Sequence, residues 1–95
     1  MGDPRKIKAI RAALMKKGFI ADDTHHEMFW LVVDGKKTSI RTRISHGAKE
    51  YGDELLALVA RQVGLSKQEL FRLIDCPMDG QKLRSLLVER GRIRL

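Results

Sequence analysis

The sequence predicts one α+β domain in the order helix, strand, strand, strand, helix, followed by one or two further helices. Three observations lead to this fold class. Apolar residues recur at helical spacing over residues 7–14. The pair Asp34-Gly35 then separates two segments with strand-like patterns, which is typical of a hairpin. Beyond residue 55 the helical spacing returns. A three-stranded antiparallel sheet with helices packed on one face accommodates this order.

The first helix is expected over residues 3–17. Asp3 followed by Pro4 has the form of a helix N-cap with proline at the first helical position. Gly18 can end the helix in the left-handed conformation, and Phe19-Ile20 then begin a short strand.

The second strand is expected from Glu27 to Val33 and the third from Lys37 to Ile44, and side chains alternate between the two faces of each strand. The outer face of the third strand is expected to be mostly cationic and to comprise Lys37, Ser39, Arg41 and Arg43. Its other face is directed at the core and comprises Thr38, Ile40, Thr42 and Ile44. Phe29 and Trp30, at the centre of the middle strand, are both expected in the core.

Three helices are expected in the C-terminal half. The first of them carries an apolar stripe over residues 55–63 and ends at the glycine that follows. Ser66 and Glu69 have the spacing of a capping box that opens the next helix. The last helix is expected over residues 81–89, and residues 90–95 form a basic tail that is expected to fray.

The length and the net charge of the chain indicate a single basic domain. The chain has 95 residues, so residues 1–95 are expected to form a single domain, with a core at 3–66 and appended helices and a tail at 67–95. The formal net charge of +7 makes a polyanion the natural partner. No apolar run approaches the ~20 residues of a membrane span, and the charged N-terminus is unlike a signal peptide. A cytoplasmic location without membrane contact is expected.

The outer face of the third strand is the first candidate site. Lys37, Arg41 and Arg43 would form one basic patch with Lys36 at the adjoining turn and Lys49 beyond the strand end. Phosphates of RNA can lie along such a patch, and arginine suits bidentate phosphate contacts. The alternative is a solvated surface that keeps the sheet from aggregating.

The histidines are the second candidate site. His25 and His26 are adjacent, so on a strand their side chains diverge, and one of them shares a face with the neighbouring cations. A histidine base can take the 2′-hydroxyl proton of RNA while cations stabilise the phosphorane. No metal or cofactor is expected, because diverging histidines do not form a ligand set and Cys76 is the only cysteine. The alternative for the pair is that both histidines are exposed surface residues without a catalytic role. The alternative for Ser45-His46-Gly47 is a loop that ends the third strand.

Several stretches together resemble the HicA toxins of bacterial and archaeal toxin-antitoxin systems, and they span most of the chain. These stretches are Lys17-Gly18-Phe19, a histidine before an apolar strand (His26 to Phe29), the Asp34-Gly35 hairpin, residues 44–50 (Ile-Ser-His-Gly-Ala-Lys-Glu) and residues 60–66 (Ala-Arg-Gln-Val-Gly-Leu-Ser). The chain departs from the family at Thr24-His25, where HicA proteins have Gly-Ser, and it extends beyond the minimal family fold from Cys76 onward.

The resemblance implies a fold like that of double-stranded-RNA-binding domains and a metal-independent ribonuclease that cleaves mRNA. It implies His26 as the general base, because its register before the apolar strand matches the family's catalytic histidine, with His25 as the alternative. Arg41 and Arg43 would hold the phosphate, and His25 or His46 would donate a proton. A partner antitoxin of the HicB type would cover the catalytic histidine.

Two other functions remain open. A non-catalytic RNA-binding module would use the same patch to contact phosphates and 2′-hydroxyls by shape. A protein-interaction domain would instead dock through the last helix, which carries Leu83, Leu86 and Leu87. A weak homodimer through a sheet edge or the last helix is compatible with the residues, although nothing in them requires it.

Overall fold

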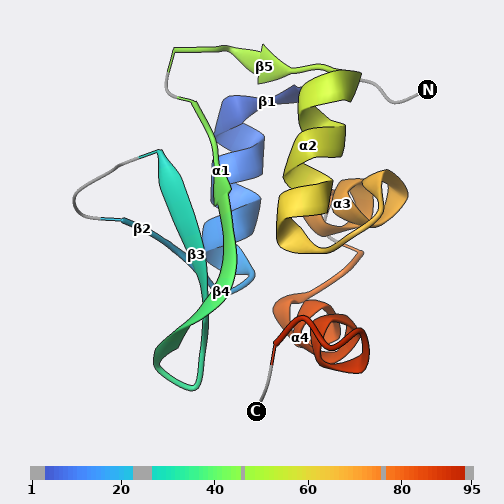
Figure 1. Ribbon diagram of the computed structural model, residues 1–95. Coiled ribbons are helices and arrows are strands. Elements are labelled where there is room, and N and C mark those ends of the chain that lie inside the picture. Colours follow the sequence, from blue (N-terminus) through green and yellow to red (C-terminus); the bar gives the residue numbers. More distant parts are fainter. Residues whose placement is uncertain (1–3, 23–26, 46, 76, 94–95) are drawn as a thin grey trace.

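The computed structural model describes residues 4–22, 27–45, 47–75 and 77–93, and it has the predicted α-β-β-β-α order with two appended helices (Figure 1). The elements are β1 (Arg5–Lys6), α1 (Ile7–Lys16), β2 (Phe19–Ala21), β3 (Met28–Val33), β4 (Lys36–Arg43), β5 (Glu50–Tyr51), α2 (Asp53–Val63), α3 (Lys67–Ile74) and α4 (Gly80–Glu89). The predicted α+β class is therefore confirmed.

The main sheet has three antiparallel strands in the order β2-β3-β4, and helices cover one of its faces (Figure 1). Helix α1 packs against β2, α2 packs against β4, and α3 packs against both helices. The middle strand buries Phe29, Leu31 and Val33. Its half-buried residues, on the opposite face, are Met28, Trp30 and Val32. The sheet thus has one closed face and one open face.

The hairpin between β3 and β4 forms as predicted. Asp34 and Gly35 both have positive φ, 54° and 80°, as a tight turn between antiparallel strands requires. Further along, the register shifts between Trp30 and Val32, and β4 carries extra residues there. The Thr38 hydroxyl donates a hydrogen bond to the Leu31 carbonyl oxygen at 2.9 Å. A side chain thus provides a partner for a backbone acceptor at the irregularity. Alternation of buried and exposed residues continues through β4.

The N-terminal start of the first helix differs from the prediction. Helix α1 begins at Ile7 rather than at Pro4, because Arg5–Lys6 form a short strand with Glu50–Tyr51. The Arg5 guanidinium also lies 2.8 Å from a carboxylate oxygen of Asp75. Pairing with distant parts of the chain therefore overrides the local helix signal. No sequence pattern pointed to this small second sheet.

The C-terminal tail also differs from the prediction, since it is folded as far as Ile93. After α4 the backbone turns at Gly91, whose φ is 69°, and the N–H of Arg92 donates to the Leu87 carbonyl at 2.8 Å. This Schellman-type turn satisfies the carbonyls at the helix end. Ile93 is then buried in the core together with Leu83 and Leu87. The expected fraying does not occur over residues 90–93, because Ile93 is an apolar residue that packs into the core; residues 94–95 lie outside the described residues.

Lys17 joins the end of α1 to the start of α4. Its side chain is buried, and its Nζ donates to the Met78 carbonyl at 2.5 Å. Gly80 opens α4 so close to Lys17 that a Cβ at residue 80 would lie 2.8 Å from the Lys17 carbonyl oxygen. Only glycine permits this approach without movement of the backbone. The appended helix is therefore an integral part of the domain.

Candidate nucleic-acid interface

The open face of the sheet is centred on Trp30. The Nζ of Lys37 lies 5.3 Å and the Cζ of Arg41 lies 5.2 Å from the centroid of its indole ring, which are cation–π distances. Arg41 is directly opposite Trp30 in β4, and Ile20 is opposite it in β2 with 43% of its surface exposed. We call Ile20, Trp30, Lys37 and Arg41 the Trp30 surface. It combines an aromatic ring, an exposed apolar side chain and two cations.

Trp30 lies on the face opposite to the one predicted. Phe29 is fully buried as expected, whereas Trp30 is only half-buried. Adjacent residues of a strand point to opposite faces, so the helices can cover only one of this pair. The indole Nε1–H donates to Asp22 Oδ2 at 3.2 Å, which fixes the edge of the ring beside the end of β2. Strict use of strand alternation would have placed Trp30 among the outer residues.

The cations on this face differ in their partners. Among the described residues, Lys37 and Arg41 form no ion pair. Each makes a cation–π contact with the Trp30 ring. Arg43 instead forms an ion pair, its Nη2 lying 2.8 Å from Glu27 Oε1, and its Nε donates to the same oxygen at 3.1 Å. The charge of Arg43 is thus partly compensated within the fold. The charges of Lys37 and Arg41 have no such compensation among the described residues.

A hollow of about 450 Å³ lies along the outer edge of β4. Its lining residues are Met28, Ser39, Arg41, Thr42, Arg43 and Gln62. The Thr42 hydroxyl donates to Gln62 Oε1 at 2.7 Å, which joins β4 to α2 at this hollow. Arg41 and Arg43 both line this hollow, which brings two arginines to one edge of the sheet.

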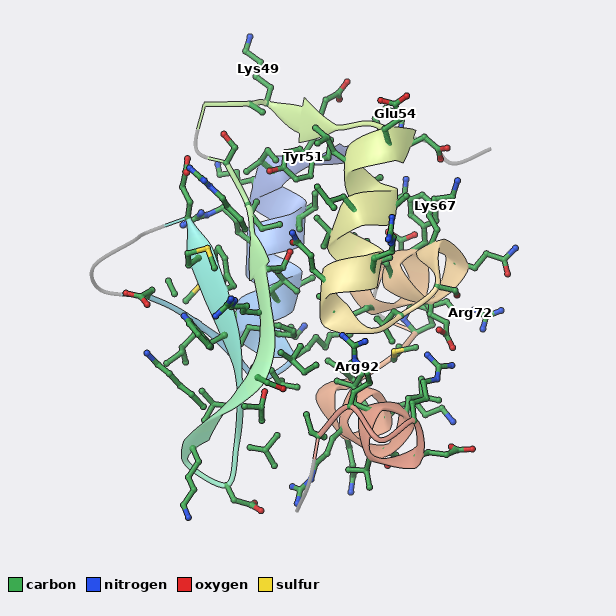
Figure 2. The ribbon with its side chains drawn as sticks, in the orientation of Figure 1. Lys49, Tyr51, Glu54, Lys67, Arg72 and Arg92 are labelled. Atoms are coloured by element: carbon green, nitrogen blue, oxygen red, sulfur yellow. The ribbon has the colours of Figure 1, made fainter. Side chains whose placement is uncertain are left out.

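The two outer lysines of the predicted patch lie far apart. Lys36 is exposed beside the turn, where β4 begins opposite Val33. Lys49 is exposed just before β5, at the opposite end of the molecule (Figure 2), and its carbonyl accepts a bond from the Ile7 N–H at 2.9 Å. The predicted basic residues therefore follow the length of β4 and continue past it, and the Trp30 surface is the part where they cluster.

The predicted catalytic and proton-donating residues lie outside the described residues; they are His25, His26 and His46. The residues that flank them in sequence are described. The N–H of Ile44 donates to the Glu27 carbonyl at 2.8 Å, and Glu27 is the neighbour of the histidine pair. Ser45, the neighbour of the third histidine, follows Ile44 directly. Glu27 and Ile44 therefore lie at one end of the β3–β4 pair, the end at which Arg43 lies opposite Met28.

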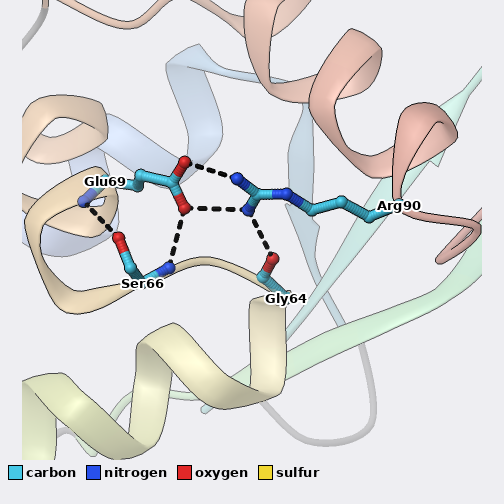
Figure 3. Close-up of polar contacts among 4 residues, drawn as sticks. All are labelled: Gly64, Ser66, Glu69 and Arg90. Atoms are coloured by element: carbon cyan, nitrogen blue, oxygen red, sulfur yellow. Dashed lines mark hydrogen bonds and ion pairs between the residues drawn. The ribbon is translucent and has the colours of Figure 1, made fainter.

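Other arginines of the chain hold the fold together, and Arg90 is the best example. It binds the carboxylate of Glu69 through two nitrogens, at 2.8 and 2.6 Å, and donates to the Gly64 carbonyl at 3.2 Å (Figure 3). Glu69 also accepts from the Ser66 N–H at 2.8 Å, which completes the predicted capping box. The bonds from Arg90 and then from Ser66 lower the pKa of the Glu69 carboxyl from 4.5 to about 2. This charge cluster is structural.

Neither a metal centre nor a membrane span is found in the described part of the chain. No group of three or more histidine, cysteine, aspartate or glutamate side chains within it could hold a metal ion. None of its helices has the length and apolar character that crossing a bilayer requires. Comparison with protein-family models, curated proteins and solved structures finds no match to this chain. A functional proposal therefore depends on the residues and their geometry.

Proposed function

We propose that this protein binds RNA on the open face of its sheet and cleaves it without a metal ion, as the toxin component of a toxin-antitoxin system. The observation that carries the RNA-binding part is the Trp30 surface, where Lys37 and Arg41 lie near the half-buried indole ring and form no ion pair among the described residues. Cleavage is inferred from the sequence resemblance to HicA toxins.

The Trp30 surface has the two properties that single-stranded RNA requires. A base would stack on the accessible part of the half-buried Trp30 ring, and stacking on an aromatic side chain is worth about 1–3 kcal/mol per base. Lys37 and Arg41 beside the ring can contact the phosphates on either side of that base. Because stacking and phosphate contacts are tolerant of sequence, we expect binding to RNAs of many sequences.

For cleavage we propose His26 as the general base. It would remove the proton of a 2′-hydroxyl, whose oxygen attacks the adjacent phosphorus and expels the 5′-oxygen of the next nucleotide. His25 or His46 would protonate that leaving oxygen. Arg41 and Arg43 line one hollow at the edge of β4 and would stabilise the charged phosphorane. The products would be a 2′,3′-cyclic phosphate and a free 5′-hydroxyl.

The proposed partner is an antitoxin of the HicB type. With a net charge of +7, the chain would associate rapidly with a partner that presents an acidic surface. By covering the open face, such a partner would block both RNA binding and access to the catalytic histidine.

A second candidate is a non-catalytic RNA-binding module. The observation that favours it is that the Trp30 surface already supplies stacking and phosphate contacts, neither of which needs a histidine. Both this candidate and the ribonuclease are expected to bind RNA. Only the ribonuclease is expected to cleave it.

The test incubates purified protein with a mixed-sequence RNA in EDTA, beside His26→Ala and His25→Ala variants whose folding is checked by circular dichroism. We expect cleavage by the wild type that persists in EDTA and is lost by at least 100-fold in His26→Ala, as removal of a general base predicts. Loss in His25→Ala alone would move the base to that residue. Intact RNA with the wild type, in a preparation free of antitoxin, would contradict the nuclease and leave the binding module.

A further inference from the structure

We infer that the RNA path continues from the Trp30 surface into a second groove, where Arg92 contacts a further backbone phosphate. This inference rests on the proposed RNA binding and assigns a role to the C-terminal turn that follows α4. It does not depend on whether the bound RNA is cleaved.

The groove lies between the β3–β4 hairpin and the turn after α4. It has a volume of about 550 Å³, within the range of ligand-binding clefts. Val33 and Ile93, both buried, contribute apolar surface to it. Its exposed lining residues include the cations Lys36, Lys37 and Arg92 and the hydroxyl of Ser39. Apolar surface with cations and a hydroxyl suits the sugar and phosphate of a nucleotide.

The charge of the groove favours an anion. Asp34 is the only acidic residue among the described residues that line it, and the Arg84 guanidinium forms an ion pair with that carboxylate at 3.1 Å. In the described structure, Lys36 and Arg92 have no ion pair or side-chain hydrogen bond that would compensate their charges. The groove therefore carries uncompensated positive charge, and a phosphate group is the ligand that would neutralise it.

Arg92 is held in place by its neighbours, which reduces the entropy lost on binding. The turn fixes its backbone through the bond from its N–H to the Leu87 carbonyl, and the next residue, Ile93, is buried. Its side chain packs over Gly64, where an added Cβ would lie 3.1 Å from Arg92 Nε. Figure 2 shows Arg92 in the space between the C-terminal end of α2 and α4. The backbone of Arg92 is therefore fixed and the stem of its side chain lies against Gly64, while the residue remains exposed.

Lys37 connects the two surfaces. Its Nζ lies 5.3 Å from the Trp30 ring, and the same residue lines the groove. In the proposed path, a strand of RNA with a base on Trp30 passes Lys37 at the edge of the hairpin and then reaches Arg92 in the groove. This continuity distinguishes the groove from a separate site for a small anion.

The test measures the affinity of full-length Arg92→Gln for a mixed-sequence single-stranded RNA and its dependence on salt. Loss of one phosphate contact should lower the affinity by about 3- to 10-fold and reduce the slope of log affinity against log salt by about 0.7. Arg72→Gln is the matched control, because Arg72 is exposed on α3 away from the groove (Figure 2), and it should change neither quantity. Trp30→Ala, in parallel, reports on the Trp30 surface by itself.

Measuring affinity against RNA length tests the groove independently of the salt dependence. In the wild type, affinity should rise with RNA length until the groove is filled, and Arg92→Gln should reach its plateau with shorter RNAs. Loss of affinity in Trp30→Ala together with wild-type affinity and slope in Arg92→Gln would overturn the groove and leave the proposed function intact. Absence of RNA binding by the wild type would overturn both proposals.

Discussion

The Trp30 surface and the C-terminal helix use the same residue types for different purposes. Around α4, Arg90 is bound to Glu69 and Arg84 to Asp34, so both of these arginines have a carboxylate partner. On the open face of the sheet, Lys37 and Arg41 lie against an aromatic ring and have no carboxylate partner among the described residues. The number of cations is therefore a poor guide to the binding site. Their partners indicate which ones are available to a ligand.

The largest effect is expected where the C-terminal helix meets the core. Leu87 is fully buried, so Leu87→Ala should lower the free energy of unfolding by about 2–5 kcal/mol through lost burial and the cavity left behind. Val88→Ala is the control in the same helix, because Val88 is 38% exposed, and it should cost less than about 1 kcal/mol. Urea unfolding monitored by circular dichroism measures both. Equal, small effects would mean that α4 is only loosely attached.

The fold was largely predictable because its signals are local. The Asp34-Gly35 turn, the capping box at Ser66 and the alternation in β4 each arise from short-range chemistry, and the structure has all three. The pairing of β1 with β5 and the burial of Ile93 depend on contacts between distant segments, which no short pattern encodes. These long-range contacts account for the two misplaced ends of the chain.

The candidate site was predictable in part. Alternation in β4 gave the outward direction of Lys37 and Arg41, which the structure confirms. It could not give the ion pair of Arg43 with Glu27, because the strand register decides which acidic residue lies within reach. Trp30 was misplaced because large aromatic residues are usually buried, and that general tendency was given more weight than the alternation of its own strand.

A comparison within β4 tests whether partners decide function. Arg41→Gln should weaken RNA binding by about 5- to 10-fold, since it removes a charge available to phosphate. Arg43→Gln should weaken it by about twofold or less, because Glu27 already compensates that guanidinium at 2.8 Å. Fluorescence anisotropy with a labelled RNA at constant salt measures both. A larger loss from Arg43→Gln would show that RNA displaces Glu27 and that the ion pair is not a barrier to binding.

The smallest effect concerns the ion pair that holds α4, and pH isolates it. The pKa of Glu69 is lowered in the folded protein from 4.5 to about 2, chiefly by the bond from Arg90, so its carboxylate stabilises the fold fully above pH 4.5 and loses this contribution as the pH falls toward 2. In Glu69→Gln the side-chain amide oxygen can still accept the capping-box bond from the Ser66 N–H, but the negative charge is removed. At pH 7 the variant should be less stable by about 1 kcal/mol, a value discounted for solvent screening.

The difference in unfolding free energy between wild type and Glu69→Gln should then shrink steadily between pH 4.5 and pH 2, because protonation removes the same charge from the wild type. Glu50→Gln, at the exposed position of β5, controls for the loss of one carboxylate from a basic protein and should show a smaller difference at pH 7. A difference between wild type and Glu69→Gln that stays constant with pH would mean that the capping geometry, and not the charge of Glu69, stabilises the junction of α3 and α4.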